Sequence, residues 1–262
     1  MLKLPDDLSR AKILVTNDDG YHAPGIQVLE KIARNISDNV WVVAPETEQS
    51  CKSHSLTLDR PLHIKKIADQ KYHVNGTPSD AMLLAINELF RDAPPDLVLS
   101  GINFGRNAGV DVTYSGTIAA AMEANMLGVP SIALSQVIED GYASWNVAET
   151  HAEVVIRKLV AMGTWPRDVI MNVNFPHETR GVVQGIKAGS HHGGKLRDDV
   201  MKREGMWGQP YYWVGHSVYD QFAEGTDVHA LENGYISVTP LHTDLTHYEF
   251  LKEMSTVIPA EA

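Results

Sequence analysis

Two adjacent carboxylates, Asp18 and Asp19, are the residues of this sequence whose types and spacing point most directly to chemistry. They follow a short apolar run at residues 13–15, within the segment KILVTNDDG. Side by side at the end of a buried strand, the two charges repel each other, and burial raises the free energy of both. A bound divalent cation would remove that cost, because hard cations take carboxylate oxygens as ligands. The alternative, an Asp-Gly hairpin turn, is disfavoured because a helical pattern follows rather than a second strand.

Two further polar loops follow predicted strands and are expected to meet the acid pair. The second predicted strand leads into a loop that contains Ser50, and a later strand leads into a loop rich in Gly and Asn that contains Asn103. The carboxyl ends of parallel strands share one edge of a sheet, where open α/β proteins bind ligands. Together with Asp18 and Asp19, these side chains would form an all-oxygen site that is open to water. Such a site suits Mg²⁺ or Mn²⁺ better than Zn²⁺.

A candidate anion site lies in the segment that opens the next predicted helix. Ser115, Gly116 and Thr117 would place backbone N–H groups and hydroxyls at a helix N-terminus, where phosphate binds readily. Plain N-capping by Ser115 explains the same residues equally well. With a metal nearby, a phosphoryl group would bridge the two sites, and metal-activated water could attack it. Asp18 or Asp19 could act as the base while ligating the metal, or the metal could suffice.

The elements that position these residues alternate regularly between strand and helix. The order β-α-β-(hairpin)-α-β-α-β-α-β favours an α/β fold with a mostly parallel, doubly wound sheet. One helix has a clear start, since Thr77, Pro78 and Asp80 suit an N-cap, a first helical residue and a capping box. Strands are expected at residues 12–16, 39–44, 96–100, 131–135 and 168–174, a hairpin at 56–66 and 71–75, and helices at 25–34, 78–91, 118–127 and 148–162.

The regular alternation of predicted strands and helices ends before residue 181. Residues 1–180 are expected to hold the core that carries the site, and residues 181–262 to complete the same domain. Exposed aromatic β arms are often contacts between protomers, so an arm in the second segment would serve oligomerisation. In that segment we expect a β-hairpin arm within residues 181–225, a short helix at 226–231, a strand at 235–239 and a helix at 248–254.

Composition and charge limit the classes of partner. The chain has 262 residues and a formal net charge of −11, which makes a nucleic-acid duplex or an anionic membrane a poor partner. The negative net charge does not exclude a small anionic substrate, because a bound metal can reverse the electrostatic field at the site. Cys51 is the single cysteine, so no intrachain disulfide can form and a reducing compartment fits. No signal peptide or apolar run of membrane length is evident, and we expect a cytoplasmic protein.

Taken together, these motifs resemble the SurE (survival protein E) family of metal-dependent 5'/3'-nucleotidases. The matching segments include ILVTNDDGYHAPGI, DLVLSGINFGRNAGVDVTYSGTIAAAMEA and GYISVTPLHTDLT, and they run from residue 13 to about residue 246. The resemblance implies a Rossmann-like core and a phosphomonoesterase, a 5'-nucleotidase that hydrolyses nucleoside 5'- and 3'-monophosphates to nucleoside and phosphate. It further implies one divalent cation per subunit and a homodimer or homotetramer built through the C-terminal arm.

The resemblance also assigns roles to individual residues. The chain departs from the family pattern at Cys51, since Gly often follows the loop serine there. His54, in the same loop, could act as an acid or contact the phosphate. Metal ligation is implied for Asp18, Asp19, Ser50 and Asn103, and proximity to the phosphate for Asn107, Ser115, Gly116 and Thr117.

Other classes of protein fit the motifs less well. A receiver-type signalling domain needs a phosphoacceptor Asp at the end of a middle strand, where this chain has Ser100 and Gly101. A haloacid-dehalogenase-like phosphatase would carry Asp-x-Asp rather than adjacent acids. Neither a dinucleotide-binding G-x-G-x-x-G after the first strand nor a Walker A loop is present. The alternative to an enzyme is a non-catalytic protein that binds metal and phosphate, or a receiver-like signalling domain.

Overall fold

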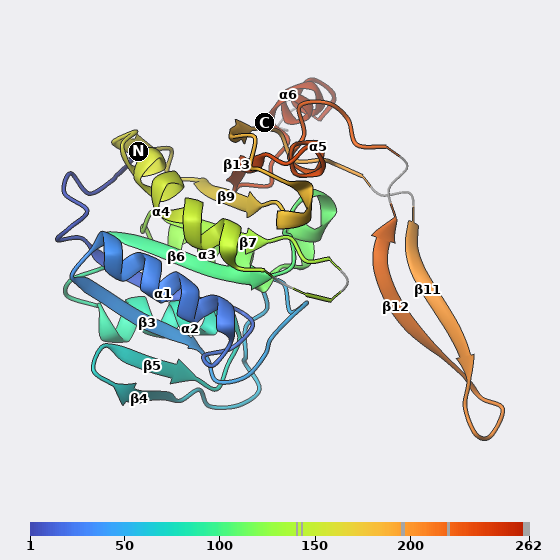
Figure 1. Ribbon diagram of the computed structural model, residues 1–262, viewed down its shortest axis with the longest axis horizontal. Coiled ribbons are helices and arrows are strands. Elements are labelled where there is room, and N and C mark those ends of the chain that lie inside the picture. The colour runs from blue at the N-terminus through green and yellow to red at the C-terminus, as the bar shows by residue number, and fades with distance from the viewer. Residues whose placement is uncertain (140, 143, 195–196, 219–220, 259–262) are drawn as a thin grey trace.

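One large sheet of short apolar strands organises the molecule (Figure 1). The structure is a computed structural model that describes residues 1–139, 141–142, 144–194, 197–218 and 221–258. The central strands are rich in Val, Ile and Leu, which favours strands that are buried on both faces. Across the sheet the strands lie in the order β10 (Ile186–Ala188), β13 (Ile236–His242), β9 (Val169–Phe175), β7 (Ser131–Gln136), β6 (Leu97–Phe104), β2 (Lys12–Thr16), β3 (Asn39–Pro45), β5 (Lys71–Val74) and β4 (Ile64–Ala68).

The sheet is mostly parallel and doubly wound, as the sequence predicts. β2 pairs in parallel with β3 on one side and with β6 on the other. The chain first winds outward through β3 and β5, then returns to the other side of β2 and winds through β6, β7 and β9. Two pairs, β9–β13 and β4–β5, are antiparallel. The winding direction therefore reverses between β2 and β6, and open α/β sheets bind ligands at the carboxyl ends of strands beside such a reversal.

A pair of helices covers each face of the sheet. α1 (Pro24–Ile36) and α4 (Asn146–Val160) pack together on one face, and α2 (Pro78–Leu84) and α3 (Gly116–Met126) on the other. Successive side chains of β2 alternate between them, since Ile13 and Val15 join the first core and Leu14 the second. The short remaining elements are β1 (Leu2–Lys3), which pairs with β8 (Thr164–Trp165), and the helical turns η1 (Ala85–Leu89), η2 (Gly109–Tyr114) and η3 (Glu178–Arg180).

Helix α2 begins as the sequence predicts. The Thr77 hydroxyl accepts a hydrogen bond from the Asp80 N–H at 3.1 Å, and Asp80 Oδ2 accepts one from the Thr77 N–H at 2.8 Å. This reciprocal pair is a capping box. Asp80 Oδ1 also accepts from the N–H of Thr57 at 3.1 Å. The same carboxylate therefore starts α2 and fixes the chain that leaves the Ser50 loop.

The predicted end of strand β6 is wrong. The strand extends to Phe104, so Asn103 lies on β6 rather than in the loop that follows. Gly101 makes this extension possible, since its φ of +137° is poorly accessible to other residues. A Cβ atom at Gly101 would also lie 2.2 Å from the carbonyl oxygen of Leu134 on β7. Glycine therefore lets β6 pass close to β7 and carry Asn103 to the edge of the sheet.

Two other predicted boundaries are wrong. In the expected hairpin, residues 56–63 form no strand, and β4 begins only at Ile64. The helix expected at 148–162 ends early, and Met162, its expected last residue, is 60% exposed. That helix ends at Val160, so Met162 lies in the turn beyond it.

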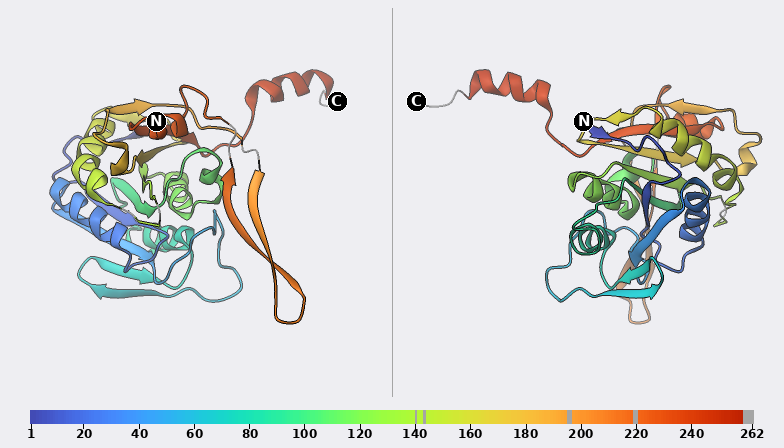
Figure 2. Two further views of the ribbon diagram at one scale, coloured as in Figure 1. Left: turned by 45° about the vertical axis from the view of Figure 1, so that its right-hand side comes forward. Right: turned by 90° about the vertical axis from the view of Figure 1, so that its left-hand side faces the viewer.

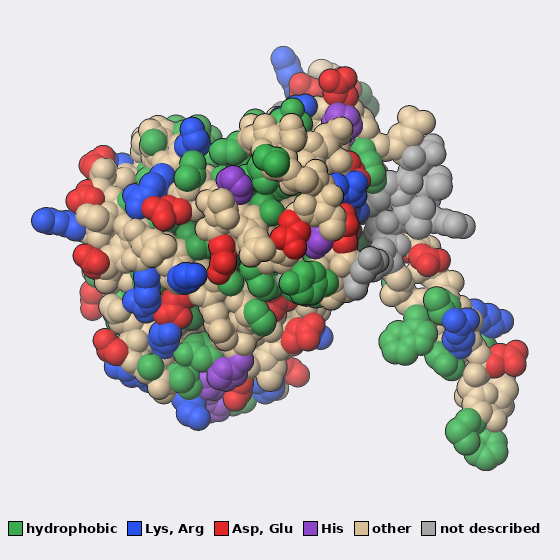
Figure 3. Space-filling model, in the orientation of Figure 1, with side chains coloured by type: hydrophobic (Ala, Val, Ile, Leu, Met, Phe, Trp, Pro, Cys, Tyr) green, Lys and Arg blue, Asp and Glu red, His purple; other side chains and the backbone are tan. Residues whose placement is uncertain are grey.

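The arm predicted within residues 181–225 is present as an antiparallel hairpin of β11 (Arg197–Glu204) and β12 (Pro210–Val218). It projects from the sheet, and apolar side chains lie along it (Figure 3). Trp207 is 89% exposed and Trp213 is 65% exposed. Residues 195–196 and 219–220 of the predicted arm lie outside the described residues.

The C-terminal part of the chain partly returns to the sheet. α5 (Asp227–Glu232) and β13 follow the arm, and α6 (Tyr248–Val257) extends away from the sheet (Figure 2). All three lie close to the helix, strand and helix that the sequence predicts. Among the described helices, none has the length and apolar composition needed to span a bilayer.

Candidate metal and phosphate site

Asp18 lies at the carboxyl end of β2 and points at the start of α3. Its side chain is buried and accepts a hydrogen bond from the Thr117 hydroxyl. Backbone N–H groups of Gly116 and Thr117 also donate to it. A Cβ atom at Gly116 would lie 2.7 Å from Asp18 Cβ and 2.8 Å from its Oδ2, so only glycine leaves room for the carboxylate. The predicted acid pair and the predicted anion site are therefore in direct contact.

Asp19 lies beside Asp18 and is tied to the end of β6. Its Oδ2 accepts a hydrogen bond from the N–H of Phe104 at 3.0 Å. Burial, followed by the negative charge of Asp18, raises the pKa of Asp19 to about 7. Burial also raises the pKa of Asp18, although the hydrogen bond from Thr117 opposes the shift. Among the described residues, neither acid forms an ion pair with a cationic side chain.

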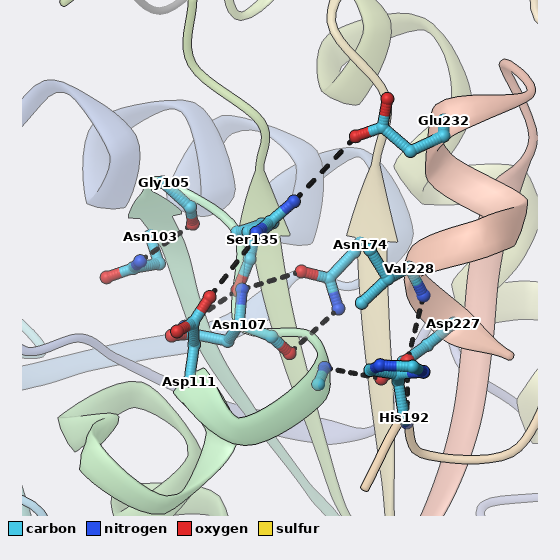
Figure 4. A network of polar contacts seen from close by, with 12 residues as sticks. Asn103, Gly105, Asn107, Asp111, Ser135, Asn174, His192, Asp227, Val228 and Glu232 are labelled. Atoms are coloured by element: carbon cyan, nitrogen blue, oxygen red, sulfur yellow. Dashed lines mark hydrogen bonds and ion pairs between the residues drawn. The ribbon is translucent and has the colours of Figure 1, made fainter. Parts of the chain in front are cut away.

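Asn103 presents an amide oxygen to the same place. Its Nδ2 donates to the carbonyl oxygen of Gly105 at 2.8 Å (Figure 4). Because the amide nitrogen is used in this way, the oxygen is the atom that faces α3, and it lies 3.2 Å from Thr117 Oγ1. Thr117 therefore lies between Asn103 and Asp18. Three elements that are far apart in the sequence thus bring their oxygens together at the reversal point of the sheet.

Ser50 lies in a loop that packs against the acid pair. The preceding residue, Gln49, donates its N–H to the carbonyl oxygen of Asp18 at 2.7 Å. Ser50 itself is exposed, and its hydroxyl donates to Glu48 Oε1 at 3.1 Å. Gly20 lies against the same loop, since a Cβ there would be 3.0 Å from the carbonyl carbon of Thr47. The structure therefore brings the Ser50 loop beside Asp18, with the Ser50 hydroxyl bonded within its own loop.

The donor set fits a hard divalent cation. The buried Asp18 and the half-buried Asp19, which have no cationic partner among the described residues, supply charge, and amide and hydroxyl oxygens supply neutral ligands. Asn17 Oδ1, next to Asp18 in the chain, is buried and has no hydrogen-bond partner among the described residues. No cluster of three His, Cys, Asp or Glu suited to a metal occurs in the described part of the chain. A metal here would therefore bind two carboxylates together with neutral oxygens and water.

Asn107, which was expected near the phosphate, is held in a buried network of amides (Figure 4). Its Nδ2 donates to Ser135 Oγ at 2.9 Å, and its N–H donates to Asn174 Oδ1 at 2.8 Å. Its carbonyl oxygen accepts from Asn172 Nδ2 at 2.7 Å. Sequence reasoning missed these partners. The signal was present, because Asn172 and Asn174 alternate at i and i+2 and so share one face of β9.

The remaining predicted phosphate residues lie at the start of α3. Ser115 caps the helix, and its Oγ accepts from the N–H of Ile118 at 3.1 Å. Gly116 and Thr117 contact Asp18, as described above. The capping interpretation of Ser115 is therefore correct. A role for these residues in binding phosphate stays a prediction.

A second buried carboxylate, Asp227, was not predicted from the sequence. It is fully buried at the start of α5 and accepts hydrogen bonds from the N–H groups of Gly109, His192 and Val228 at 2.9, 3.0 and 2.8 Å (Figure 4). His191 Nε2 lies 2.8 Å from the carbonyl oxygen of Gly109. These contacts join the loop after β6 to α5 and to the base of the arm. No local sequence signal distinguishes Asp227 from a helix-start acid.

The fold and the site define an open α/β protein whose acidic, oxygen-lined centre lies at the reversal point of a doubly wound sheet. The chain belongs to the SurE family, since the family model described as "Survival protein SurE" matches residues 13–197. The family membership predicted from the sequence is thereby confirmed.

Named relatives resemble the chain over nearly its whole length. A protein of Paramagnetospirillum magneticum named "5'-nucleotidase SurE" is 50% identical and covers 95% of this chain and 96% of its own length. A protein of Parvibaculum lavamentivorans with the same name is 49% identical, covering 94% and 91%. The crystal structure of the SurE protein from Aquifex aeolicus is similar, with a TM-score of 0.81, 38% identity and coverage of 94% of this chain and 98% of that one. The predicted fold class is therefore confirmed.

Proposed function

We propose that this chain is a divalent-metal-dependent phosphomonoesterase that hydrolyses nucleoside 5'-monophosphates, and also 3'-monophosphates, to nucleoside and phosphate. The enzyme class, 5'-nucleotidase, is that of its relatives at about 50% identity. The observation that carries the metal-dependent mechanism is the convergence of Asp18, Asn103 and Thr117 on one point. A buried and a half-buried acid side by side, with no cationic partner in the described part of the chain, are costly unless a cation binds.

The metal would be held by Asp18, Asp19, Ser50 and Asn103. A bound Mg²⁺ or Mn²⁺ would polarise the phosphoryl group and lower the pKa of the attacking water. Asp19 Oδ2 is fixed by the N–H of Phe104, so we assign Oδ1 to the cation or to the proton of the attacking water. The two acids are thus the proposed catalytic residues.

The phosphate would lie at the start of α3, with Asn107, Ser115, Gly116 and Thr117 as its proposed contacts. Supporting this placement, Gly116 and Thr117 already touch Asp18, so an anion there would meet both the helix N-terminus and the cation. The Ser135 and Asn174 contacts hold Asn107 on the same edge of the sheet. The chain's own groups would therefore orient the phosphorus toward the acid pair.

We also infer a cytoplasmic homodimer or homotetramer that assembles through the β11–β12 hairpin. Support comes from the aromatic side chains that the hairpin exposes, because large apolar groups on a projecting arm favour a partner surface. Residues 1–180 would supply the catalytic core, and residues 181–262 would complete it and add the arm.

The test is phosphate release from a panel of nucleoside 5'- and 3'-monophosphates with Mg²⁺, with Mn²⁺ and with chelator. Wild type is expected to release phosphate only with metal. Asp19→Asn should lower release at least about 100-fold, because losing even an outer-shell partner of a metal costs about 10–100-fold. Asp69→Asn, at a carboxylate that is 92% exposed, is the matched control and should behave as wild type. Metal binding without release from any substrate would instead favour a non-catalytic binding protein.

A further inference from the structure

The loop that carries Ser50 has an unusual backbone. Cys51 has a φ of +59° and Ser53 a φ of +52°, although neither is glycine. Non-glycine residues in this left-handed region are strained, and the surrounding structure must hold them there. Cys51 directly follows the proposed metal ligand Ser50, and Ser53 lies three residues after it, so the contacts that hold this loop bear on the metal site.

Hydrogen bonds anchor both ends of the strained segment, one end at Asp18 and the other at the turn that precedes α3. On one side, the N–H of Gln49 donates to the carbonyl oxygen of Asp18 at 2.7 Å. On the other, the N–H of Ser53 donates to the carbonyl oxygen of Tyr114 at 3.1 Å, and its hydroxyl donates to that of Thr113 at 2.8 Å. Residues 50–52 therefore span the short gap between the end of β2 and the turn that precedes α3.

His54 adds a further anchor, to a carboxylate on α3. Its Nε2 lies 2.8 Å from Oε2 of Glu123 on α3. The Glu123 side chain is 11% exposed and that of His54 is 31% exposed, so the contact is partly shielded from water. A hydrogen bond to a carboxylate is stronger than one between two neutral groups. Full exposure to solvent would remove much of that advantage, and here the contact is partly shielded. Two residues separate His54 from the strained Cys51, so this bond limits how far the Ser50 segment can move.

We propose that His54 is a positioning residue of the metal site: paired with Glu123, it holds the Ser50 loop against Asp18 and the start of α3 and thereby raises the affinity for the divalent cation. The inference rests on the proposed function in assigning Ser50 to the cation. It assigns His54 no direct contact with substrate. A merely structural pair would instead stabilise the fold and leave the cation affinity unchanged.

The first readout is trypsin cleavage after Lys52, an exposed residue inside the strained segment, in the metal-free protein. His54→Ala should increase the cleavage rate about tenfold, because losing a hydrogen bond to a charged group shifts the open population by about that factor. His63→Ala, at an exposed histidine near β4, is the matched control and should cleave as wild type. Equal cleavage of His54→Ala and wild type would overturn the claim that this pair holds the loop.

The second readout is the Mn²⁺ dissociation constant, measured by calorimetry without substrate. His54→Ala should weaken binding about tenfold, the lower range for outer-shell partners of a metal. His54→Gln, which can still donate to Glu123, should restore most of the affinity. A lower melting temperature with unchanged Mn²⁺ affinity would mean a structural role only and would overturn the proposal.

Failure of the proposed function gives a different pattern. If Ser50→Ala loses Mn²⁺ and His54→Ala does not, only the positioning role is wrong. If wild type binds no Mn²⁺, or Asp19→Asn and Ser50→Ala bind as wild type, the metal site itself is wrong, and the affinity part of this inference falls with it.

Discussion

At the scale of single residues, the position of Asp18 depends on the absence of a side chain at Gly116. An added Cβ would lie 2.7 Å from Asp18 Cβ. We predict that Gly116→Ala displaces the carboxylate, weakens Mn²⁺ binding at least about tenfold and costs about 1–3 kcal/mol of stability through overpacking. Calorimetry and thermal melting measure the two effects. Gly193→Ala, where nothing lies within 4 Å of the added atom, is the control; equal Mn²⁺ affinity in Gly116→Ala and wild type would refute the contact.

Asp19 should destabilise the metal-free protein. Its pKa of about 7 in the folded chain lies above the ordinary 3.8, so between these values the folded state binds more protons than the unfolded state. Stability therefore falls as pH rises through that window, and the full penalty is present above it. We predict that Asp19→Asn raises the melting temperature of metal-free protein by about 5 °C or more at pH 8, with a smaller gain near pH 5. A gain that does not depend on pH would contradict this electrostatic origin.

The acid pair is also the part of the site that the sequence reveals best. Asp18 and Asp19 stand together in the chain, and their cost on burial can be argued without knowing any distant partner. Asn174 and Asp227 are different, because they meet Asn107 and Gly109 across 67 and 118 residues of sequence. Their roles become visible only when the sheet is assembled.

At the scale of elements, Asn107 lies in the loop that follows β6, and side chains of β9 fix its position. Asn174 is fully buried and bonds both the N–H and the carbonyl oxygen of Asn107. We predict that Asn174→Ala lowers stability by about 1–3 kcal/mol, because it leaves the buried N–H of Asn107 without its partner, whereas the carbonyl oxygen keeps the bond from Asn172. It should also reduce phosphate release while leaving Mn²⁺ affinity nearly unchanged, since the proposed metal ligands lie elsewhere.

Asn35→Ala, at an exposed asparagine on α1, is the matched control for this substitution. Thermal melting and calorimetry separate the two readouts. A loss of Mn²⁺ affinity as large as the loss of phosphate release would place Asn107 with the metal rather than with the phosphate.

Element boundaries were predictable where a local signal exists. Thr77 and Asp80 form the expected capping box because both partners lie within one turn. The end of β6 was not predictable, because a glycine normally weakens a strand. Gly101 instead permits a close approach to Leu134, which belongs to a neighbouring strand.

At the scale of the whole molecule, the order of the strands brings the site residues together, whereas the β11–β12 arm projects away from the sheet. The alternation of apolar runs predicts a doubly wound sheet, and with it the convergence of the ends of β2 and β6. The placement of the arm relative to the sheet did not follow from the sequence, since no periodicity records the direction in which a hairpin projects.

We predict that the hairpin carries self-association. Trp207→Ser combined with Trp213→Ser should weaken assembly at least about tenfold, because an interface Trp is often worth 2 kcal/mol or more. Sedimentation velocity over a range of concentrations measures this change, and the melting temperature of the core should stay close to wild type. Val182→Ser, at a residue that is 84% exposed outside the hairpin, is the control. Unchanged assembly of the double variant would exclude these side chains from the interface.

Metal-dependent hydrolysis is tested by titrating Mn²⁺ into metal-free protein and measuring, in the same samples, bound metal per chain and phosphate release from a nucleoside 5'-monophosphate. We predict one bound ion per chain, release that rises in proportion to occupancy, and loss of both in Asp19→Asn. Undiminished release in the presence of chelator, or equal binding and release by Asp19→Asn, would contradict it.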